Sequence, residues 1–171
     1  MADIFTRRKR SEVMSLIRSA GNKATELRLI RIFRAQGIKG WRRQQVIRFN
    51  VQPSTLNPER SKLGVGRRKL SRGVRPDFIF PRSTGSGLRR AKPVAVFVDG
   101  CFWHGCPRHG TKPKQNAKFW REKIAGNRAR DRRVNCALRK RGWKVMRIWE
   151  HELLKNNKTR FFKRLAPLLQ F

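Results

Sequence analysis

The sequence predicts a single α/β domain in which helices flank a central mixed β-sheet. Two short apolar runs, residues 78–80 and 94–98, are bounded by turn-forming residues and indicate two strands of a hairpin. A helical segment at about 117–140 is followed by an alternating segment, residues 143–149, that indicates a third strand. Because a helix between two strands is typical of a crossover connection, the third strand should lie parallel to an earlier one.

The chain is expected to form one short arm and one domain. Residues 1–20 predict a basic arm with a short helix capped at Ser11, and residues 21–171 the domain, which is long enough for one core. Within it, residues 50–73 are basic, rich in turn formers and without periodicity. They predict a loop insertion that orders when it contacts nucleic acid.

The elements before this insertion are a helix and a weak strand. The helix should begin near Asn22 or Thr25 and end at Gly37, because apolar residues recur between them at helical spacing. Residues 41–49 alternate weakly and predict one strand.

The long helix of the second half is expected to be capped by Asn116, interrupted at Gly126 and ended by Gly142. Cys136, in the middle of this helix, is expected in the core.

A last helix should begin at Asn157 or Thr159, and Pro167 should end or kink it. Its expected inward residues are Phe161, Phe162, Leu165, Leu168 and Leu169.

The net positive charge of the chain indicates what kind of molecule it binds. Lys and Arg number 44 against 10 acidic residues, a net charge of +34, which favours a polyanion and above all nucleic acid. The sequence has no apolar run near the ~20 residues that span a bilayer and no signal-peptide pattern. Three cysteines cannot all pair within one chain, and Cys101 and Cys106 lie among histidines. A metal site in a reducing cytoplasm fits this better than a disulfide framework, so we expect a cytoplasmic protein with no membrane partner.

Two carboxylates lie near predicted strand ends in a chain with few acids. Asp77 precedes the first strand of the hairpin and Asp99 follows the second. Hard oxygen ligands in a basic protein suit Mg²⁺, which assists phosphodiester cleavage by stabilising the charged oxygens. The alternative is that both are turn residues. Glu26 has two interpretations as well, a helix N-terminal acid favoured by the macrodipole or a group near this metal edge.

A second cluster carries ligands of the kind that zinc prefers. Cys101, Cys106 and His109 lie on one loop, and His151, after the third strand, offers a fourth ligand. Such a closed site would be structural. The alternatives are buried free thiols with exposed histidines, or Cys136 as the fourth ligand.

His104 lies inside this cluster. If the zinc takes four other ligands, His104 is free to act as a general base or acid. It could instead replace His109 on the zinc, and the spacing leaves both interpretations open.

Aromatic residues occur at two exposed positions of a basic protein, Phe102-Trp103 at a loop tip and Phe119-Trp120 at the start of the long helix. Such side chains can wedge between stacked bases. The alternative is that they cover the core, which we expect for Phe119.

Four segments together resemble the very-short-patch-repair (Vsr) mismatch endonucleases, a zinc-containing branch of the PD-(D/E)XK nucleases. They are PDFIF, VAVFVDGCFWHGCPRHGTKP, FWREKIAGNRARDRR and GWKVMRIWEHEL, and the amino-terminal RSEVMSLIRSAGNKATELRL is also similar. The likeness covers nearly the whole chain except the 50–72 segment and the carboxyl end.

The resemblance implies a restriction-endonuclease-like fold and Mg²⁺-dependent cleavage of one DNA strand 5′ to the T of a T:G mismatch, which arises by deamination of 5-methylcytosine. It implies that Asp77 binds the metal with the Val98 carbonyl, that His104 is the general base or acid, and that Glu26 and Asp131 support them. Intercalation is implied for Phe102, Trp103 and Trp120, and structural Zn²⁺ for Cys101, Cys106, His109 and His151. The resemblance also implies that the protein is a monomer at the bacterial nucleoid. It further implies a functional link to a cytosine-5 DNA methyltransferase and to mismatch-repair proteins.

The chain departs from the family pattern at three points. Val98 replaces a polar residue, Asp99 replaces a histidine and is a candidate additional metal ligand, and His151 replaces a cysteine among the zinc ligands. The usual PD-(D/E)XK lysine is absent, with Cys101 two residues after Asp99, as this histidine-using branch leads one to expect. Two rival functions are a same-fold restriction or defence nuclease without mismatch specificity and a non-catalytic zinc-stabilised nucleic-acid binder of ribosomal type.

Overall fold

The computed structural model describes residues 25–48, 73–82, 92–111, 113–154 and 158–169, together with 6, 8, 9 and 12. The expected 50–73 insertion lies outside the described residues except at its end, where Gly73 begins a strand. Most of the expected arm lies outside them too, but Arg8 and Lys9 are helical, ahead of the cap predicted at Ser11.

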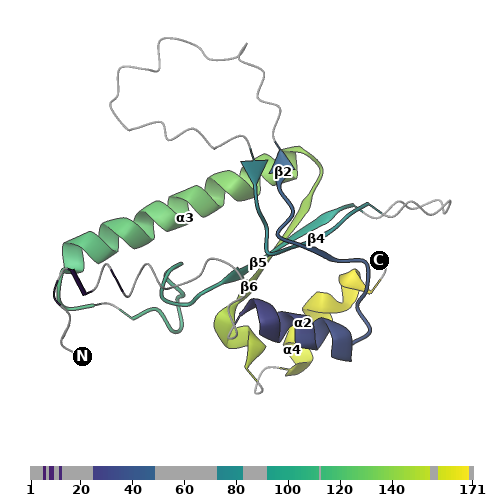
Figure 1. Cartoon of the computed structure of the whole chain (residues 1–171), viewed down its shortest axis with the longest axis horizontal. Helices are drawn as coiled ribbons and strands as arrows, with labels where there is room; N and C mark the ends of the chain where they lie inside the picture. The colour runs from purple at the N-terminus through teal and green to yellow at the C-terminus, as the bar shows by residue number, and fades with distance from the viewer. Residues whose placement is uncertain are drawn as a thin grey trace, which may run out of the picture.

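From residue 25 onward, the described part of the chain begins with a helix, continues with five short strands, and then has a long helix, a sixth strand and a carboxyl-terminal helix (Figure 1). The described elements are α2 (Glu26–Ala35), β1 (Arg42–Arg43), β2 (Ile47–Arg48), β3 (Gly73–Val74), β4 (Phe78–Phe80), β5 (Val94–Asp99), α3 (Ala117–Lys140), β6 (Lys144–Trp149), the 3-10 helix η3 (Glu150–Leu153), α4 (Lys158–Leu165) and the 3-10 helix η5 (Ala166–Leu168).

The central sheet is mixed and has the strand order β1-β4-β5-β6. β4 and β5 pair antiparallel, which confirms the predicted hairpin, and β5 and β6 pair parallel, which confirms the crossover through α3. In this register Asp99 lies opposite Trp149 at the end of both strands. The residues that follow the two strands therefore meet at one edge of the sheet.

Helices cover both faces of this sheet (Figure 1). On one face α2 and α4 enclose the larger core, in which Phe33, Phe78 and Phe80 are fully buried. On the other face α3 packs through Val134 and Leu138. Because side chains alternate along a strand, the residues of β5 are shared between the two layers. Val94 and Val96 enter the larger core, and Ala95 and Phe97 face α3.

The single strand expected over 41–49 is wrong. The chain forms β1 and β2, which belong to different sheets, with a break at Gln44. Gln44 has a φ of 51°, in the left-handed region, and its backbone N–H donates a hydrogen bond to the backbone carbonyl of Asp77. A left-handed residue cannot continue an extended strand, so the backbone turns here and directs Gln44 toward Asp77.

α3 corrects two predictions about the long helix. It runs without interruption through Gly126, because one glycine weakens a helix without breaking it. Asn116 lies before the helix in a left-handed conformation and makes no side-chain capping bond. Gly142, with a φ of 78°, follows the end of the helix as predicted.

The carboxyl-terminal helix agrees with its prediction at its inner residues. Phe161, Leu165 and Leu168 are buried and Phe162 is partly buried, but Leu169 is 59% exposed, so its inward assignment is wrong. Pro167 ends the α-helix, which continues as the 3-10 turn η5. In the described part of the chain, none of the helices is long and apolar enough to cross a membrane.

Candidate active site and metal centre

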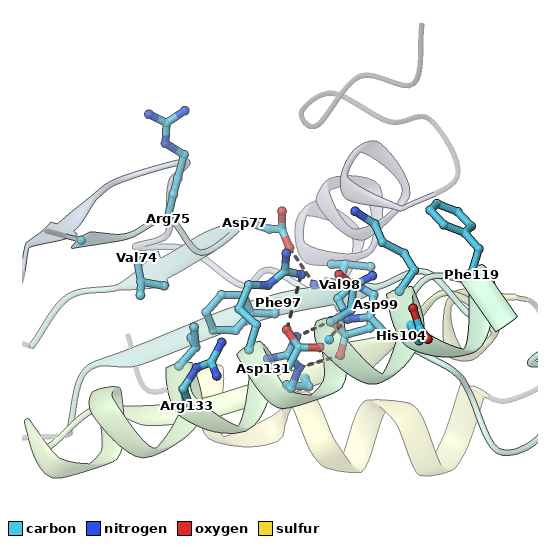
Figure 2. A pocket seen from close by; sticks show the side chains of 18 residues that line it. Val74, Arg75, Asp77, Phe97, Val98, Asp99, His104, Phe119, Asp131 and Arg133 are labelled. Atoms are coloured by element: carbon cyan, nitrogen blue, oxygen red, sulfur yellow. Dashed lines mark hydrogen bonds and ion pairs between the residues drawn. The ribbon is translucent and has the colours of Figure 1, made fainter. Parts of the chain in front are cut away.

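A hollow of roughly 920 Å³ lies between the central sheet and α3 (Figure 2). Asp77, Asp99 and His104 line it from the sheet side, and Asp131 lines it from the helix. The helix also contributes Lys123, Arg130 and Arg133 to the lining. The hollow therefore holds a group of carboxylates and an imidazole inside a basic rim.

Asp77 lies just before β4 at the edge of this hollow. One of its carboxylate oxygens accepts a 2.7 Å hydrogen bond from the backbone N–H of Val98, and the side chain of Gln44 lies 3.5 Å from the other. Burial raises the pKa of Asp77 to about 6, helped by the charges of Glu26 and Asp99 and opposed by the Val98 hydrogen bond. The carboxyl group is thus held where a cation would favour its charged form.

Glu26 belongs to the same edge of the sheet. It is 3% exposed at the start of α2, and its oxygens accept hydrogen bonds of 3.0 Å from Arg43 and 3.0 Å from Gln44. Because Gln44 also approaches Asp77, Glu26 is connected to the metal-edge carboxylate through one amide. The position fits the functional interpretation of Glu26 and also its place in the first turn of a helix.

His104 is oriented by two carboxylates. Its Nδ1 lies 2.6 Å from Asp131 and 3.6 Å from Asp99. Burial alone would raise the pKa of Asp131, but the hydrogen bond from His104 and the charge of Arg147 outweigh it and lower that pKa. An ionised carboxylate accepts a hydrogen bond from Nδ1–H, which leaves Nε2 as the ring nitrogen with a free lone pair.

Asp99 is 4% exposed and forms an ion pair with Arg147. Both carboxylate oxygens accept hydrogen bonds from that guanidinium, at 2.6 and 2.8 Å. The expected contact of Asp99 with a metal therefore competes with an existing ion pair. Asp77, whose partners are neutral amides, has no such competitor among the described contacts.

The four predicted zinc ligands lie together. The ligand atoms of Cys101, Cys106, His109 and His151 are all within 4.8 Å of one another. Burial raises the pKa of the Cys101 thiol and lowers the pKa of His151, so a cation is needed to favour the thiolate. Two sulfur and two imidazole ligands are a donor set that suits zinc. Cys136 is exposed on α3 and not part of this cluster, so its core assignment is wrong.

Phe102, Trp103 and Trp120 form one aromatic group on the same loop as Cys101 and Cys106 and at the start of α3. Their ring centroids lie 5.1 to 5.9 Å apart, so the loop tip and the start of α3 contact each other through these rings. All three are partly exposed. Phe119 extends the group to solvent and is 56% exposed, so the expectation that it covers the core is wrong.

Sequence reasoning missed three polar residues of the site. Gln44 connects Glu26 and Asp77, Arg147 connects Asp99 and Asp131, and Asn127 donates to the backbone carbonyl of Trp103 at 2.9 Å. One signal was available for Arg147, since it is a charged residue that interrupts the apolar segment 145–149.

Comparison with known proteins gives several relatives, while no protein-family model matches the chain. The chain is 34% identical to the type II nicking enzyme V.NmeAIP of Neisseria meningitidis, over 99% of this chain and 96% of that enzyme. It is 30% identical to the DNA mismatch endonuclease Vsr of Escherichia coli, over 88% of this chain and 74% of that enzyme. The chain is 47% identical to V.NaeI of Lentzea aerocolonigenes over 83 residues. The matched part of the chain spans 45 to 60%, or about half, of the length of V.NaeI and of two other nicking enzymes.

The two relatives that match most of this chain are a nicking enzyme and a DNA mismatch endonuclease, so both belong to the class of endonucleases. The chain belongs to the family of Vsr-like nicking endonucleases.

Proposed function

We propose that this protein nicks one strand of double-stranded DNA on the 5′ side of the T in a T:G mismatch and uses Mg²⁺ to do so. The observation that carries the proposal is the hollow in which Asp77 and an oriented His104 lie under basic residues of α3. The name of the E. coli relative supports mismatch DNA as the substrate. The nicking enzymes among the relatives support cleavage of one strand.

Asp77 would hold the Mg²⁺ together with the carbonyl of Val98. The backbone N–H of Val98 already points to Asp77, and in a strand the N–H and the carbonyl of one residue point to the same side. Carboxylate and carbonyl oxygens suit this cation. When bound, Mg²⁺ supplies charge stabilisation at the phosphodiester that undergoes cleavage.

His104 would accept the proton of the attacking water at Nε2. Asp131 supports this role because it accepts the hydrogen bond from Nδ1 and stays ionised. Proton transfer from water to nitrogen lets the oxygen attack phosphorus as the bond to the leaving oxygen breaks. Glu26, through Gln44, would hold Asp77 in position.

The basic lining of the hollow would bind the DNA backbone. Lys123, Arg130 and Arg133 lie along one side of α3 next to the carboxylates, so phosphates bound there would pass the site. The aromatic group of Phe102, Trp103 and Trp120 would insert beside the mismatch, where a weakly stacked pair is easiest to open.

A structural metal and the folded sheet would hold the proposed catalytic groups in place. We assign structural Zn²⁺ to Cys101, Cys106, His109 and His151, on the strength of their donor chemistry and proximity. The mixed sheet with helices on both faces is compatible with a restriction-endonuclease-like fold. We further propose a cytoplasmic monomer that works with a cytosine-5 DNA methyltransferase and mismatch-repair proteins.

A nicking assay on end-labelled duplexes tests the function. Matched, T:G and other mismatched duplexes of one sequence are incubated with Mg²⁺, and the cut is mapped to the nucleotide on each strand. We expect a single cut 5′ to the mismatched T, and a loss of roughly 100-fold or more in rate for Asp77→Asn and His104→Gln. Arg34→Gln, on the exposed side of α2, is the control and should keep full activity.

Two results would contradict the proposal in different ways. Equal cutting of matched and T:G duplexes favours a restriction or defence nuclease. Binding without cutting, unchanged by Asp77→Asn and His104→Gln, favours a non-catalytic nucleic-acid binder.

A further inference from the structure

Arg147 occupies a position between the candidate catalytic groups. It lies on β6 opposite Phe97 of β5, and its side chain is 20% exposed on the face of the sheet that α3 covers. Its guanidinium lies 4.9 Å from the centroid of the Phe97 ring. This stacking limits the plane in which the guanidinium can lie.

All three guanidinium nitrogens have partners. Nε and Nη2 donate to the two oxygens of Asp99 at 2.6 and 2.8 Å, and Nη1 donates to Asn135 at 3.1 Å. Nη2 also lies 3.0 Å from Asp131. One arginine therefore joins a strand-end carboxylate to a helix carboxylate, an arrangement that needs the planar fork of arginine.

The two oxygens of Asp131 are divided between Arg147 and His104. Oδ1 contacts Arg147 and Oδ2 contacts Nδ1 of His104 at 2.6 Å. With both oxygens held, the plane of the carboxylate is fixed, and so is the direction of the hydrogen bond that orients the imidazole. Figure 2 labels Asp99, His104 and Asp131, which lie close together, and marks interactions between the residues drawn with dashed lines.

Without Arg147, two carboxylates would approach the same imidazole nitrogen. Asp99 and Asp131 lie 3.6 and 2.6 Å from Nδ1 of His104. Asp99 would lose the guanidinium that neutralises it, and Oδ1 of Asp131 would keep only the more distant, exposed Arg130 at 3.7 Å, so the repulsion between the two carboxylates would increase.

We propose that Arg147 is a positioning residue of the endonuclease, which holds Asp99 and Asp131 in place so that Asp131 orients His104 toward the DNA. Asp99 then acts through Arg147 and is not a ligand of the catalytic metal. The inference rests on the proposed function and adds to it an ion pair that the family resemblance does not supply.

The kinetic test compares Arg147→Gln with Arg147→Lys and with the control Arg34→Gln, which removes one charge from exposed α2. We expect Arg147→Gln to lower kcat roughly 10- to 100-fold with little change in KM for DNA, because a misoriented base costs rate and not binding. Arg147→Lys should recover a small part, since an ammonium cannot bridge two carboxylates bidentately. Millimolar guanidinium should restore part of the activity of Arg147→Ala and leave the activity of Arg34→Gln unchanged.

A Mg²⁺ titration separates the two roles of Asp99. If Asp99 acts through Arg147, Asp99→Asn lowers kcat at the same half-saturating Mg²⁺ concentration, and adding Arg147→Gln lowers it little further. A several-fold increase in the half-saturating Mg²⁺ concentration for Asp99→Asn, with Arg147→Gln near wild type, would overturn the inference.

A measurement on the DNA-free protein does not depend on activity. We expect the ring N–H proton of His104, observed by nitrogen-15 NMR, to be protected from exchange with solvent. This protection should be lost in Arg147→Gln and kept in Arg34→Gln. Unchanged protection in a folded Arg147→Gln variant would overturn the inference. A wild-type protein that shows the protected signal but nicks no duplex would overturn the proposed function instead.

Discussion

At Asp77, burial opposes the charge that the proposed reaction needs. The pKa of this carboxyl group is raised from 3.8 to about 6, chiefly by burial. Between these values the folded state keeps a proton that the unfolded state has released, so folding stability falls as the pH rises through this range. Metal binding at Asp77 would offset this loss, which is a physical reason for a cation at this position.

We therefore expect Asp77→Asn to raise the melting temperature in the absence of added Mg²⁺, more at pH 7 than at pH 4.5. The neutral amide removes the cost of an ionised buried group, which is present above the folded pKa of about 6 and absent below 3.8. Thermal unfolding followed by circular dichroism across this pH range measures the difference in melting temperature between the variant and the wild type. Glu122→Gln, an exposed carboxylate on α3, is the matched control. If the difference in melting temperature between wild type and Asp77→Asn were the same at every pH, the raised pKa of Asp77 would be contradicted.

At the scale of elements, the Cys/His cluster of the proposed zinc site brings together the ends of two strands. Cys101 and Cys106 follow β5, and His151 follows β6. His104 lies on the loop between the two cysteines, so the same ligands that close the cluster also fix the loop that carries the imidazole.

Cys106→Ser should lower the melting temperature by roughly 6–12 °C, corresponding to a loss of about 3 kcal/mol, because metal binding contributes to folding. Metal analysis by atomic emission should give one zinc per wild-type chain and clearly less in this variant. Cys136→Ser, which removes an exposed thiol outside the cluster, should change neither quantity. Equal stability and metal content in Cys106→Ser would rule out a structural metal held by this residue.

At the scale of the whole molecule, the charge of +34 should dominate the affinity for DNA. Each phosphate that the protein neutralises releases counterions, so binding weakens with salt. For about 6–10 phosphate contacts, we expect an affinity loss of roughly 10³- to 10⁵-fold between 50 and 200 mM salt, measured by fluorescence anisotropy. The ratio of affinities for T:G and matched duplexes should change much less, because aromatic insertion carries no charge. An affinity independent of salt would contradict electrostatic binding.

The sequence predicted the elements whose signals are local. The β4–β5 hairpin, the crossover through α3 and the meeting of Cys101 with His151 follow from short apolar runs and from the residues at their ends. The break at Gln44 was missed because its backbone conformation depends on a tertiary hydrogen bond to Asp77. Arg147 was missed for a similar reason, since its partners come from β5 and from α3.

Because side chains alternate along β5 and β6, the polar groups that these two strands contribute to the hollow lie on the face that α3 covers, opposite the larger core. The side chains of Asp99 and Arg147 lie on the α3 side of the sheet, where the hollow is, whereas the side chains of their neighbours Val98 and Ile148 pack against the larger core. A substitution of Asp99 or Arg147 therefore leaves the larger core on the opposite face intact. Such a scaffold lets an enzyme exchange one set of polar groups for another, and so acquire a new preference for its substrate, without having to rebuild its interior.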